Sequence, residues 1–302
     1  MPRVTGDRVR QPAAGGRGRP GRHQVVACLG RDRTTLEERP LPLPGAGELL
    51  LGLRVAGLCG TDLFKLATGS AAAGSVLGHE LVGQVVAVGP GVTRFRDGDR
   101  VVAPHHVPCG ECALCRAGNE TMCDVFRENL LDPGGFADMI LVRPRATELA
   151  ARLVPGGVAD QAAVFMEPAA CVLRSVRRSG IDGRGAVVVL GAGSMGLLHL
   201  LVLRALFPDI AVSVIDPVAE RRALAERLGA VAAAAPGAPA LEQVISASDG
   251  VGAYAVFDTV GGRDTLEAGL ELIRRGGTVV LFAHAPEGAR AGFEINTLFK
   301  SE

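Results

Sequence analysis

Residues 186–216 constrain the fold of this chain more than any other stretch. They contain an apolar run (AVVVL), a glycine-rich turn, an apolar helical segment and a second apolar run that ends at Asp216. Short apolar runs that alternate with helical segments are typical of a parallel α/β sheet. The alternation continues to GTVVLFA at 277–283, so the second half of the chain is predicted to form a doubly wound parallel sheet.

The longest apolar stretch, residues 186–207, has the length of a membrane span. Three glycines interrupt its first half, and His199 and Arg204 interrupt its second half. Polar and charged side chains are costly in hydrocarbon, so a buried strand followed by a buried helix is the favoured interpretation. With neither a span nor a signal peptide in view, we expect a cytoplasmic protein that does not bind membranes.

The first half of the chain has a different pattern. Between residue 24 and about residue 145, short apolar segments such as QVVACLG, LVGQVVAVG and ADMILVRP alternate with Pro and Gly, which predicts a mostly β domain. Residues 1–23 carry six Arg and no apolar run, so we expect a disordered tail. An organellar transit peptide is the alternative, but such peptides are amphipathic and rich in Ser. The predicted domains are therefore 24–155 and 156–302, and the second is expected to begin with a linker helix.

Composition limits the classes of partner. The 302 residues contain 32 Lys+Arg and 32 Asp+Glu, so bulk charge does not favour nucleic acid. With 48% hydrophobic residues, the chain has enough apolar material for about two domain cores.

The sharpest motif is a cluster of four cysteines spaced C-x2-C-x2-C-x7-C, in a lobe at about 105–125. Its members are Cys109, Cys112, Cys115 and Cys123. Zinc prefers a tetrahedron of thiolates, and four thiolates close its coordination shell, so the spacing predicts a structural zinc site. Disulfides or free thiols are the alternatives, and an iron–sulfur cluster would normally take its fourth Cys from elsewhere in the chain.

A second, looser group is a further candidate for a metal site. Cys59 lies in AGLCGTD, and His79 and Glu80 follow in LGHE. Alone, such residues are more often core or surface groups than ligands. The glycines that flank them indicate tight backbone at strand ends, where side chains can converge on a cleft.

The glycine-rich turn predicts a dinucleotide site. Gly191 would make the turn, Gly193 would let a pyrophosphate approach, and Gly196 would let helix and strand pack. An acid at Asp216 favours NAD over NADP, because it would bind the ribose hydroxyls. Further candidate contacts to the cofactor are Ser194, Met195 and Arg221. The rival hypothesis is a nucleophile elbow with Ser194 as nucleophile and His284 as base, which leaves the glycine spacing unexplained.

Together the motifs resemble the zinc-dependent medium-chain dehydrogenase/reductase family, in the branch of sorbitol, threonine and related polyol dehydrogenases. The resemblance runs from about residue 24 to 302 and includes GLCGTD, LGHELVGQVVAVGPGV, GGFAD, MEPAA and GAGSMG. It implies a GroES-like catalytic domain, a Rossmann coenzyme domain and an active-site cleft between them. Two zinc ions per chain and NAD are the implied cofactors.

The resemblance also implies residue roles. The residues around a catalytic zinc would be Cys59, His79, Glu80 and Glu167. Thr61 would hydrogen-bond the substrate alkoxide and begin the proton relay. The implied reaction oxidises a secondary alcohol of a polyol, cyclitol or amino alcohol to a ketone. The alternative is a non-catalytic remnant that binds zinc and nucleotide.

Some positions depart from the family pattern. Phe64 stands where many relatives have a relay His, and the chain ends at FEINTLFKSE, where relatives continue. We therefore expect a Rossmann domain truncated at its C-terminus, with a homodimer or homotetramer only if the sheet edge is intact. His105 and His106 are expected to be exposed loop residues, and Cys171 a buried thiol.

Overall fold

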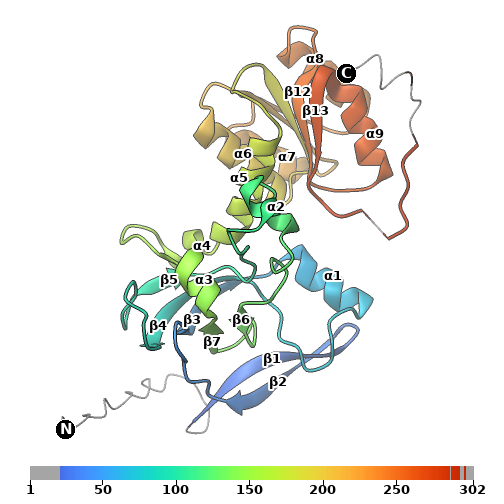
Figure 1. Cartoon of the computed structure of the whole chain (residues 1–302). Helices are drawn as coiled ribbons and strands as arrows, with labels where there is room; N and C mark the ends of the chain where they lie inside the picture. The colour runs from blue at the N-terminus through green and yellow to red at the C-terminus, as the bar shows by residue number, and fades with distance from the viewer. Residues whose placement is uncertain (1–20, 286, 293–295, 297–302) are drawn as a thin grey trace, which may run out of the picture. The chain divides into compact units, whose positions relative to one another are not determined.

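The structure, a computed structural model, describes residues 21–285, 287–292 and 296. The chain divides into two compact units, Met1–Glu167 and Pro168–Glu302 (Figure 1). Each unit has hydrophobic core clusters of its own.

The strands of the first unit form two antiparallel sheets, as the mostly β pattern predicts. A hairpin pairs β1 (Arg22–Gly30) with β2 (Arg33–Pro40). The larger sheet has the order β6-β7-β3-β4-β5-β8. Its members are β3 (Leu49–Gly57), β4 (Glu80–Val88), β5 (Arg100–Val102), β6 (Leu131–Asp132), β7 (Met139–Val142) and β8 (Arg152–Leu153).

Short helices connect these strands and carry several of the candidate site residues. They are α1 (Gly60–Thr68), α2 (Ala113–Arg116), the 3-10 helix η1 (Glu120–Met122), α3 (Pro144–Leu149) and α4 (Asp160–Ala163). The sequence patterns did not reveal them, because segments this short show little periodicity. Inside the sheet, Leu49, Leu50 and Leu51 of β3 are all buried, so this strand is covered on both faces and its burial does not alternate.

The division between the units lies later than the predicted boundary at 155/156. Asp160 of α4 accepts hydrogen bonds from Arg54 of β3 at 2.6 Å and from Arg100 of β5 at 2.8 Å. Val164 packs with Val82 and other apolar residues of the first unit. Residues 156–167 therefore belong to the first unit, because side chains far away in the sequence hold them there.

The second unit is built on one parallel sheet with the order β11-β10-β9-β12-β13. Its strands are β9 (Ala186–Leu190), β10 (Ala211–Ile215), β11 (Ala232–Ala234), β12 (Ala253–Asp258) and β13 (Ile273–Leu281). The helices are α5 (Met166–Arg178), which begins in the first unit, α6 (Ser194–Leu206), α7 (Ala219–Arg227), α8 (Ala238–Ala247) and α9 (Arg263–Leu272). This order reverses direction between β9 and β12, as in doubly wound dinucleotide-binding sheets.

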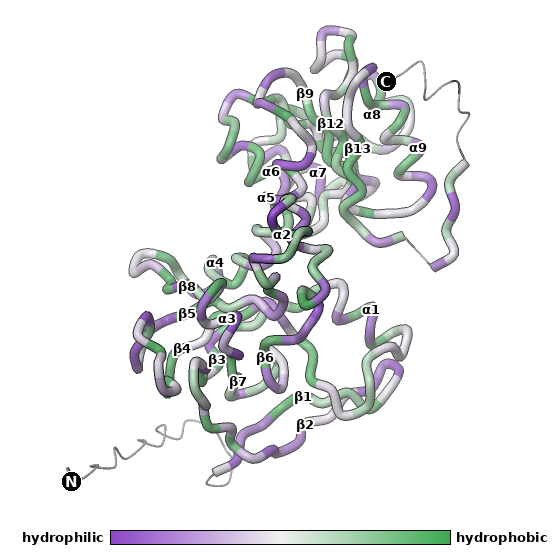
Figure 2. The backbone as a smooth tube through the Cα atoms, viewed as in Figure 1, coloured by the Kyte–Doolittle hydropathy of each residue, from purple (hydrophilic) through white to green (hydrophobic). Residues whose placement is uncertain are grey.

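Strand β9, at the centre of this sheet, consists of apolar residues only, and hydrophobic residues predominate in its neighbours (Figure 2). All five residues of β9 are buried, which accounts for a continuous apolar run in place of an alternating one. The stretch that resembled a membrane span thus divides into β9 and α6, and within the described residues no helix has the length and apolar character needed to cross a bilayer. The sequence pattern predicts a helix over the whole segment DTLEAGLELIRR (264–275), and this was wrong in detail: α9 ends at Leu272, and Arg274 and Arg275 belong to β13.

Candidate metal centres and dinucleotide site

The four cysteines of the predicted structural site lie together. Their sulfur atoms are within 4.8 Å of one another, with Sγ–Sγ distances of 3.9 Å for Cys109–Cys115, 3.5 Å for Cys112–Cys115 and 3.7 Å for Cys123–Cys109. A tetrahedron with Zn–S bonds of about 2.3 Å has edges of about 3.8 Å, whereas a disulfide requires about 2.05 Å. The four free thiols therefore fit one zinc ion and leave it no open position.

Backbone amides shape this lobe around the sulfur atoms. Cys112 caps α2 and its sulfur accepts the N–H of Cys115, while the sulfur of Cys109 accepts the N–H of Cys112. Backbone N–H groups of Glu111 and Cys112 lower the pKa of the Cys109 thiol to about 7. Burial, followed by a hydrogen bond to the Cys112 thiol, raises the pKa of Cys115 to about 12. The loop by itself thus favours the thiolate that a metal requires at Cys109 and not at Cys115.

The second group also converges. The ligand atoms of Cys59, His79 and Glu80 lie within 4.8 Å of one another. Cys59 is the N-cap of α1, and Glu80 opens β4 directly opposite Gly57 of β3. A Cβ at Gly57 would lie 2.2 Å from Oε2 of Glu80, so the first glycine of the motif leaves room for this carboxylate.

A buried carboxylate that the sequence analysis missed organises this group. Oδ1 of Asp62 lies 3.5 Å from Nδ1 of His79, and Asp62 is only 1% exposed. Its two oxygens also accept the N–H groups of Cys59 at 3.2 Å and Gly78 at 3.3 Å. Histidines that bind metals commonly donate their other ring nitrogen to a carboxylate in this way. Asp62 lies in the GTD motif, three residues after Cys59, and this spacing is the sequence feature that could have identified it as the supporting carboxylate.

The electrostatics around His79 favour a cation. Burial by itself lowers the pKa of His79. Hydrogen bonds to Asp62 and Cys59 raise it, the charge of Glu167 adds to them, and the pKa lies at about 10. Glu167, the last residue of the first unit, thus acts on the same imidazole. A thiol, an imidazole and carboxylates form a donor set that suits zinc.

The two histidines before the cysteine lobe are not exposed, so that expectation was wrong. The His105 ring lies 4.5 Å from the ring of His79 and 3.6 Å from that of His106. Burial, followed by repulsion from His106 and His79, lowers the pKa of His105 to about 2. Both histidines therefore belong to the surroundings of the Cys59 group. Cys171 also differs from expectation, because it is exposed.

The GGFAD segment is hydrogen-bonded to the backbone just before His79. Gly135 donates its N–H to the carbonyl of Gly78, and Phe136 donates to Leu77. A Cβ at Gly78 would lie 2.9 Å from atoms of Phe136, and the φ of +88° favours glycine there. The backbone before His79 is thereby fixed against a second tight loop.

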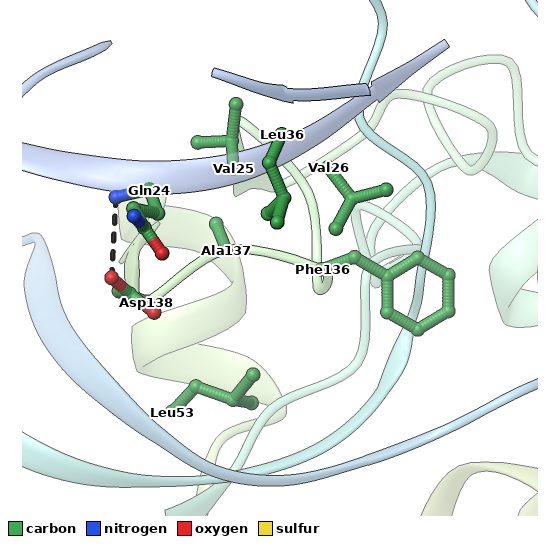
Figure 3. Close-up of a pocket in the computed structure, with 8 residues that line it drawn as sticks. All are labelled: Gln24, Val25, Val26, Leu36, Leu53, Phe136, Ala137 and Asp138. Atoms are coloured by element: carbon green, nitrogen blue, oxygen red, sulfur yellow. Dashed lines mark hydrogen bonds between the residues drawn. The ribbon is translucent and has the colours of Figure 1, made fainter. Parts of the chain in front are cut away.

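Beside that loop lies an apolar pocket of about 230 Å³ (Figure 3). Leu36 of β2 and Leu53 of β3 contribute to its lining, and the N–H of Gln24 donates to Asp138 at 3.2 Å at its edge. None of the candidate metal ligands lines it. The pocket is therefore not part of the candidate metal site.

The three glycines of the dinucleotide motif differ in their surroundings. Gly191 has a φ of +95°, and a Cβ at Gly196 would lie 1.9 Å from the carbonyl oxygen of Gly191. At Gly193, by contrast, a Cβ would meet nothing within 4 Å. Gly193 is the N-cap of α6 and leaves open space at the helix N-terminus, where a phosphate is favoured. The loop fits a pyrophosphate.

Asp216 follows β10 and is 3% exposed. Its carboxylate accepts the N–H of Ala192 at 2.7 Å and that of Val218 at 2.8 Å, so it ties the glycine-rich turn to the loop before α7. Arg221 lies 3.9 Å from it.

The alternative of a nucleophile elbow at Ser194 finds no support in the structure. Ser194 is exposed and opens α6 together with Met195. A nucleophile elbow needs a hydrogen bond from Ser194 to its base, and within the described residues none joins Ser194 to His284.

Comparison with known proteins places the chain among dehydrogenases. Residues 45–151 match the "Alcohol dehydrogenase GroES-like domain" family and residues 191–302 the "Zinc-binding dehydrogenase" family. D-altritol 5-dehydrogenase of Agrobacterium fabrum is 35% identical, over 90% of this chain and 80% of the relative. L-threonine 3-dehydrogenase of Pyrococcus abyssi is 30% identical, over 88% and 77%. The solved structure of a zinc-binding dehydrogenase of Sinorhizobium meliloti 1021 bound to NADP has a TM-score of 0.82 at 28% identity, covering 93% of this chain and 82% of that one.

Fold and site together define a two-domain, zinc-dependent oxidoreductase of the alcohol dehydrogenase type. The chain belongs to the zinc-dependent medium-chain dehydrogenase/reductase family, in its polyol-dehydrogenase-like branch. Zinc and a nicotinamide dinucleotide are the cofactors of this family, and the predicted GroES-like and Rossmann folds are confirmed.

Proposed function

We propose that the chain oxidises a secondary alcohol to a ketone with NAD as hydride acceptor, on a substrate of the polyol, sugar-acid or amino-alcohol type. The observation that carries the proposal is the convergence of Cys59, His79 and Glu80 within 4.8 Å. The residues come from a helix cap and a strand start, and the charge of Glu167 acts on the same group. Such a mixed sulfur, nitrogen and oxygen set is typical of a catalytic zinc with an open position.

Each residue has a defined task in this scheme. The metal would be held by Cys59, His79 and Glu167, with Glu80 as an additional or alternating carboxylate. When bound, zinc supplies Lewis-acid polarisation of the alcohol oxygen and the dinucleotide accepts the hydride. Asp62 holds the ring of His79 in the orientation that presents its other nitrogen to the metal. The hydroxyl of Thr61, which directly precedes Asp62, would accept the alcohol proton while it donates its own to water, so that it relays the proton and carries no charge.

For the cofactor we propose NAD. The Asp216 carboxylate stands at the end of β10, where the ribose hydroxyls bind in dinucleotide folds, and its negative charge disfavours a 2′-phosphate. The partly free guanidinium of Arg221, 3.9 Å from Asp216, would contact the adenosine end. Steady-state kinetics with NAD and NADP at equal concentrations test this choice, and a higher kcat/KM for NADP would contradict it.

The proposed reaction is tested by measuring zinc content and NADH formation on the same sample, with a panel of alditols, aldonates, cyclitols and amino alcohols. We expect two zinc ions per chain and turnover of at least one class. Cys59→Ser should reduce the count to one and abolish turnover, whereas the control Cys28→Ala, at a buried thiol of β1, should keep both zinc ions. Two bound zinc ions without turnover of any alcohol would support the non-catalytic alternative.

A further inference from the structure

Lys65 occupies a position on α1 that the proposed mechanism does not use. The chain contains 30 Arg and only two Lys, Lys65 and Lys300. Lys65 follows Asp62 by three residues and Thr61 by four, and such spacings place side chains on one helix face. Because Asp62 points to His79, the face that carries Lys65 borders the Cys59 group.

Electrostatic effects on neighbouring side chains agree with this placement. Burial is the main reason why the pKa of His106 falls to about 4, and the charge of Lys65 is the next cause. The charge of Lys65 also contributes, after burial and the neighbouring histidines, to the lowered pKa of His105. The charge of Lys65 thus acts on two histidines whose rings lie beside that of His79, 4.5 Å from it in the case of His105.

The charge of Lys65 is not matched by a carboxylate. Lys65 is exposed, and no ion pair to it is found among the residues that the structure describes. The nearest acid along its helix, Asp62, is already engaged with His79 and two backbone N–H groups. Arg127, another exposed cation, also acts on His106. Two exposed cations, Lys65 and Arg127, therefore act on the histidine pair beside His79.

We propose that Lys65 is a specificity-determining residue that binds the carboxylate of the substrate, so that the preferred substrate is an anionic hydroxy acid of the aldonate type and not a neutral polyol. This inference rests on the proposed alcohol oxidation. Thr61 and Lys65 are separated by about 6 Å along the helix axis. Because the four-carbon stem of lysine is flexible, Lys65 would select for a carboxylate on the substrate and not for one fixed chain length.

Kinetics with matched pairs of aldonates and alditols of the same configuration, such as D-gluconate and D-sorbitol, test the proposal. We expect wild type to prefer the aldonate, and Lys65→Met to lower kcat/KM for it by 10- to 100-fold, mainly through KM, with less than a 2-fold change for the alditol. Lys65→Arg should recover part of the loss. The control Arg96→Met removes an 89% exposed cation of the same unit and should change neither value.

A second measurement is independent of turnover. In a Lys300→Arg background, Lys65 is the sole lysine, so trinitrobenzenesulfonate modification monitored at the Lys65 peptide reports on this side chain. An aldonate should protect Lys65 in the zinc-loaded protein, and the matched alditol should not. If turnover fails for every substrate, the proposed function falls, whereas protection still tests the role of Lys65.

The pyrophosphate of the dinucleotide is a second anionic group that Lys65 could bind in place of the substrate carboxylate. The dissociation constant of NAD, measured by calorimetry without substrate, should be the same for wild type and Lys65→Met. A weaker NAD affinity together with unchanged aldonate selectivity would overturn the proposal in favour of a cofactor contact. Equal loss for aldonate and alditol, or no change in any value, would also overturn it.

Discussion

Oδ1 of Asp62 lies 3.5 Å from Nδ1 of His79, and both side chains are buried. The contact joins the first turn of α1 to the residue before β4 and fixes which ring nitrogen of His79 remains for a metal. The same carboxylate accepts the N–H of Cys59, so one buried group orients two candidate ligands.

Replacing this carboxylate should weaken the catalytic metal site. In Asp62→Asn we expect a 10- to 100-fold lower zinc affinity at the Cys59 group, since substitutions of such supporting carboxylates typically have this effect. Chelator competition measures the affinity, and the four-cysteine site serves as an internal reference. Asp97→Asn, at an exposed position, is the matched control. Equal zinc affinity in the two variants would contradict the role of Asp62.

The glycine before His79 should be required for stability. Gly78→Ala places a Cβ 2.9 Å from Phe136 at a φ of +88°, so we expect a loss of about 3 kcal/mol or more in the free energy of unfolding. Gly74→Ala, at a φ of +81° with nothing within 4 Å, carries the backbone strain alone and should cost about 1 kcal/mol. Urea unfolding of both variants separates the steric clash from the backbone strain. Similar decreases in the free energy of unfolding would show that the contact with Phe136 does not require a glycine at position 78.

Replacing two glycines of the dinucleotide turn by alanine should affect different properties, NAD affinity for Gly193 and stability for Gly196. Gly193→Ala meets no protein atom within 4 Å, so the variant should fold with unchanged thermal stability and bind NAD at least about 10-fold more weakly, because the methyl group takes the space of the phosphate. Gly196→Ala places a Cβ 1.9 Å from the Gly191 oxygen and should lower stability itself. Calorimetric titration and thermal melting test the pair. Unchanged NAD affinity in Gly193→Ala would show that the phosphate binds elsewhere.

A buried histidine of the second unit should make stability depend on pH. His199 is fully buried, with Nδ1 2.7 Å from the carbonyl of Met195 and Nε2 2.8 Å from Oγ of Ser175. Burial lowers its pKa to about 4. Between about pH 6.5 and pH 4, His199 is therefore protonated in the unfolded state and neutral in the folded state. The free energy of unfolding should decrease as the pH falls through this range, by up to about 3 kcal/mol.

The matched variant for this effect is His199→Leu. Its unfolding free energy should lack the acidic decline attributed to His199, so the difference between wild type and variant should shrink from pH 7 to pH 4. Urea unfolding at several pH values measures it. Parallel curves for the two proteins would mean that His199 is not the responsible group.

The sequence by itself determined the features whose causes are local. Cys109 and Cys123 belong to one loop of 15 residues that can surround an ion without help from the rest of the chain, so their spacing sufficed. The glycines at 191, 193 and 196 were equally informative, since a turn followed by a helix sets their φ values and the space around them.

Only the tertiary structure decided which distant groups meet. Pairing of Gly57 with Glu80 between β3 and β4 brings Cys59 beside His79, and salt bridges from Arg54 and Arg100 to Asp160 hold the segment that leads to Glu167. The partial burial of His105 beside His79 also arises from this packing. Strand pairing and ion pairs act between residues far apart in the chain, so the sequence around one residue does not identify the partner that the fold brings to it.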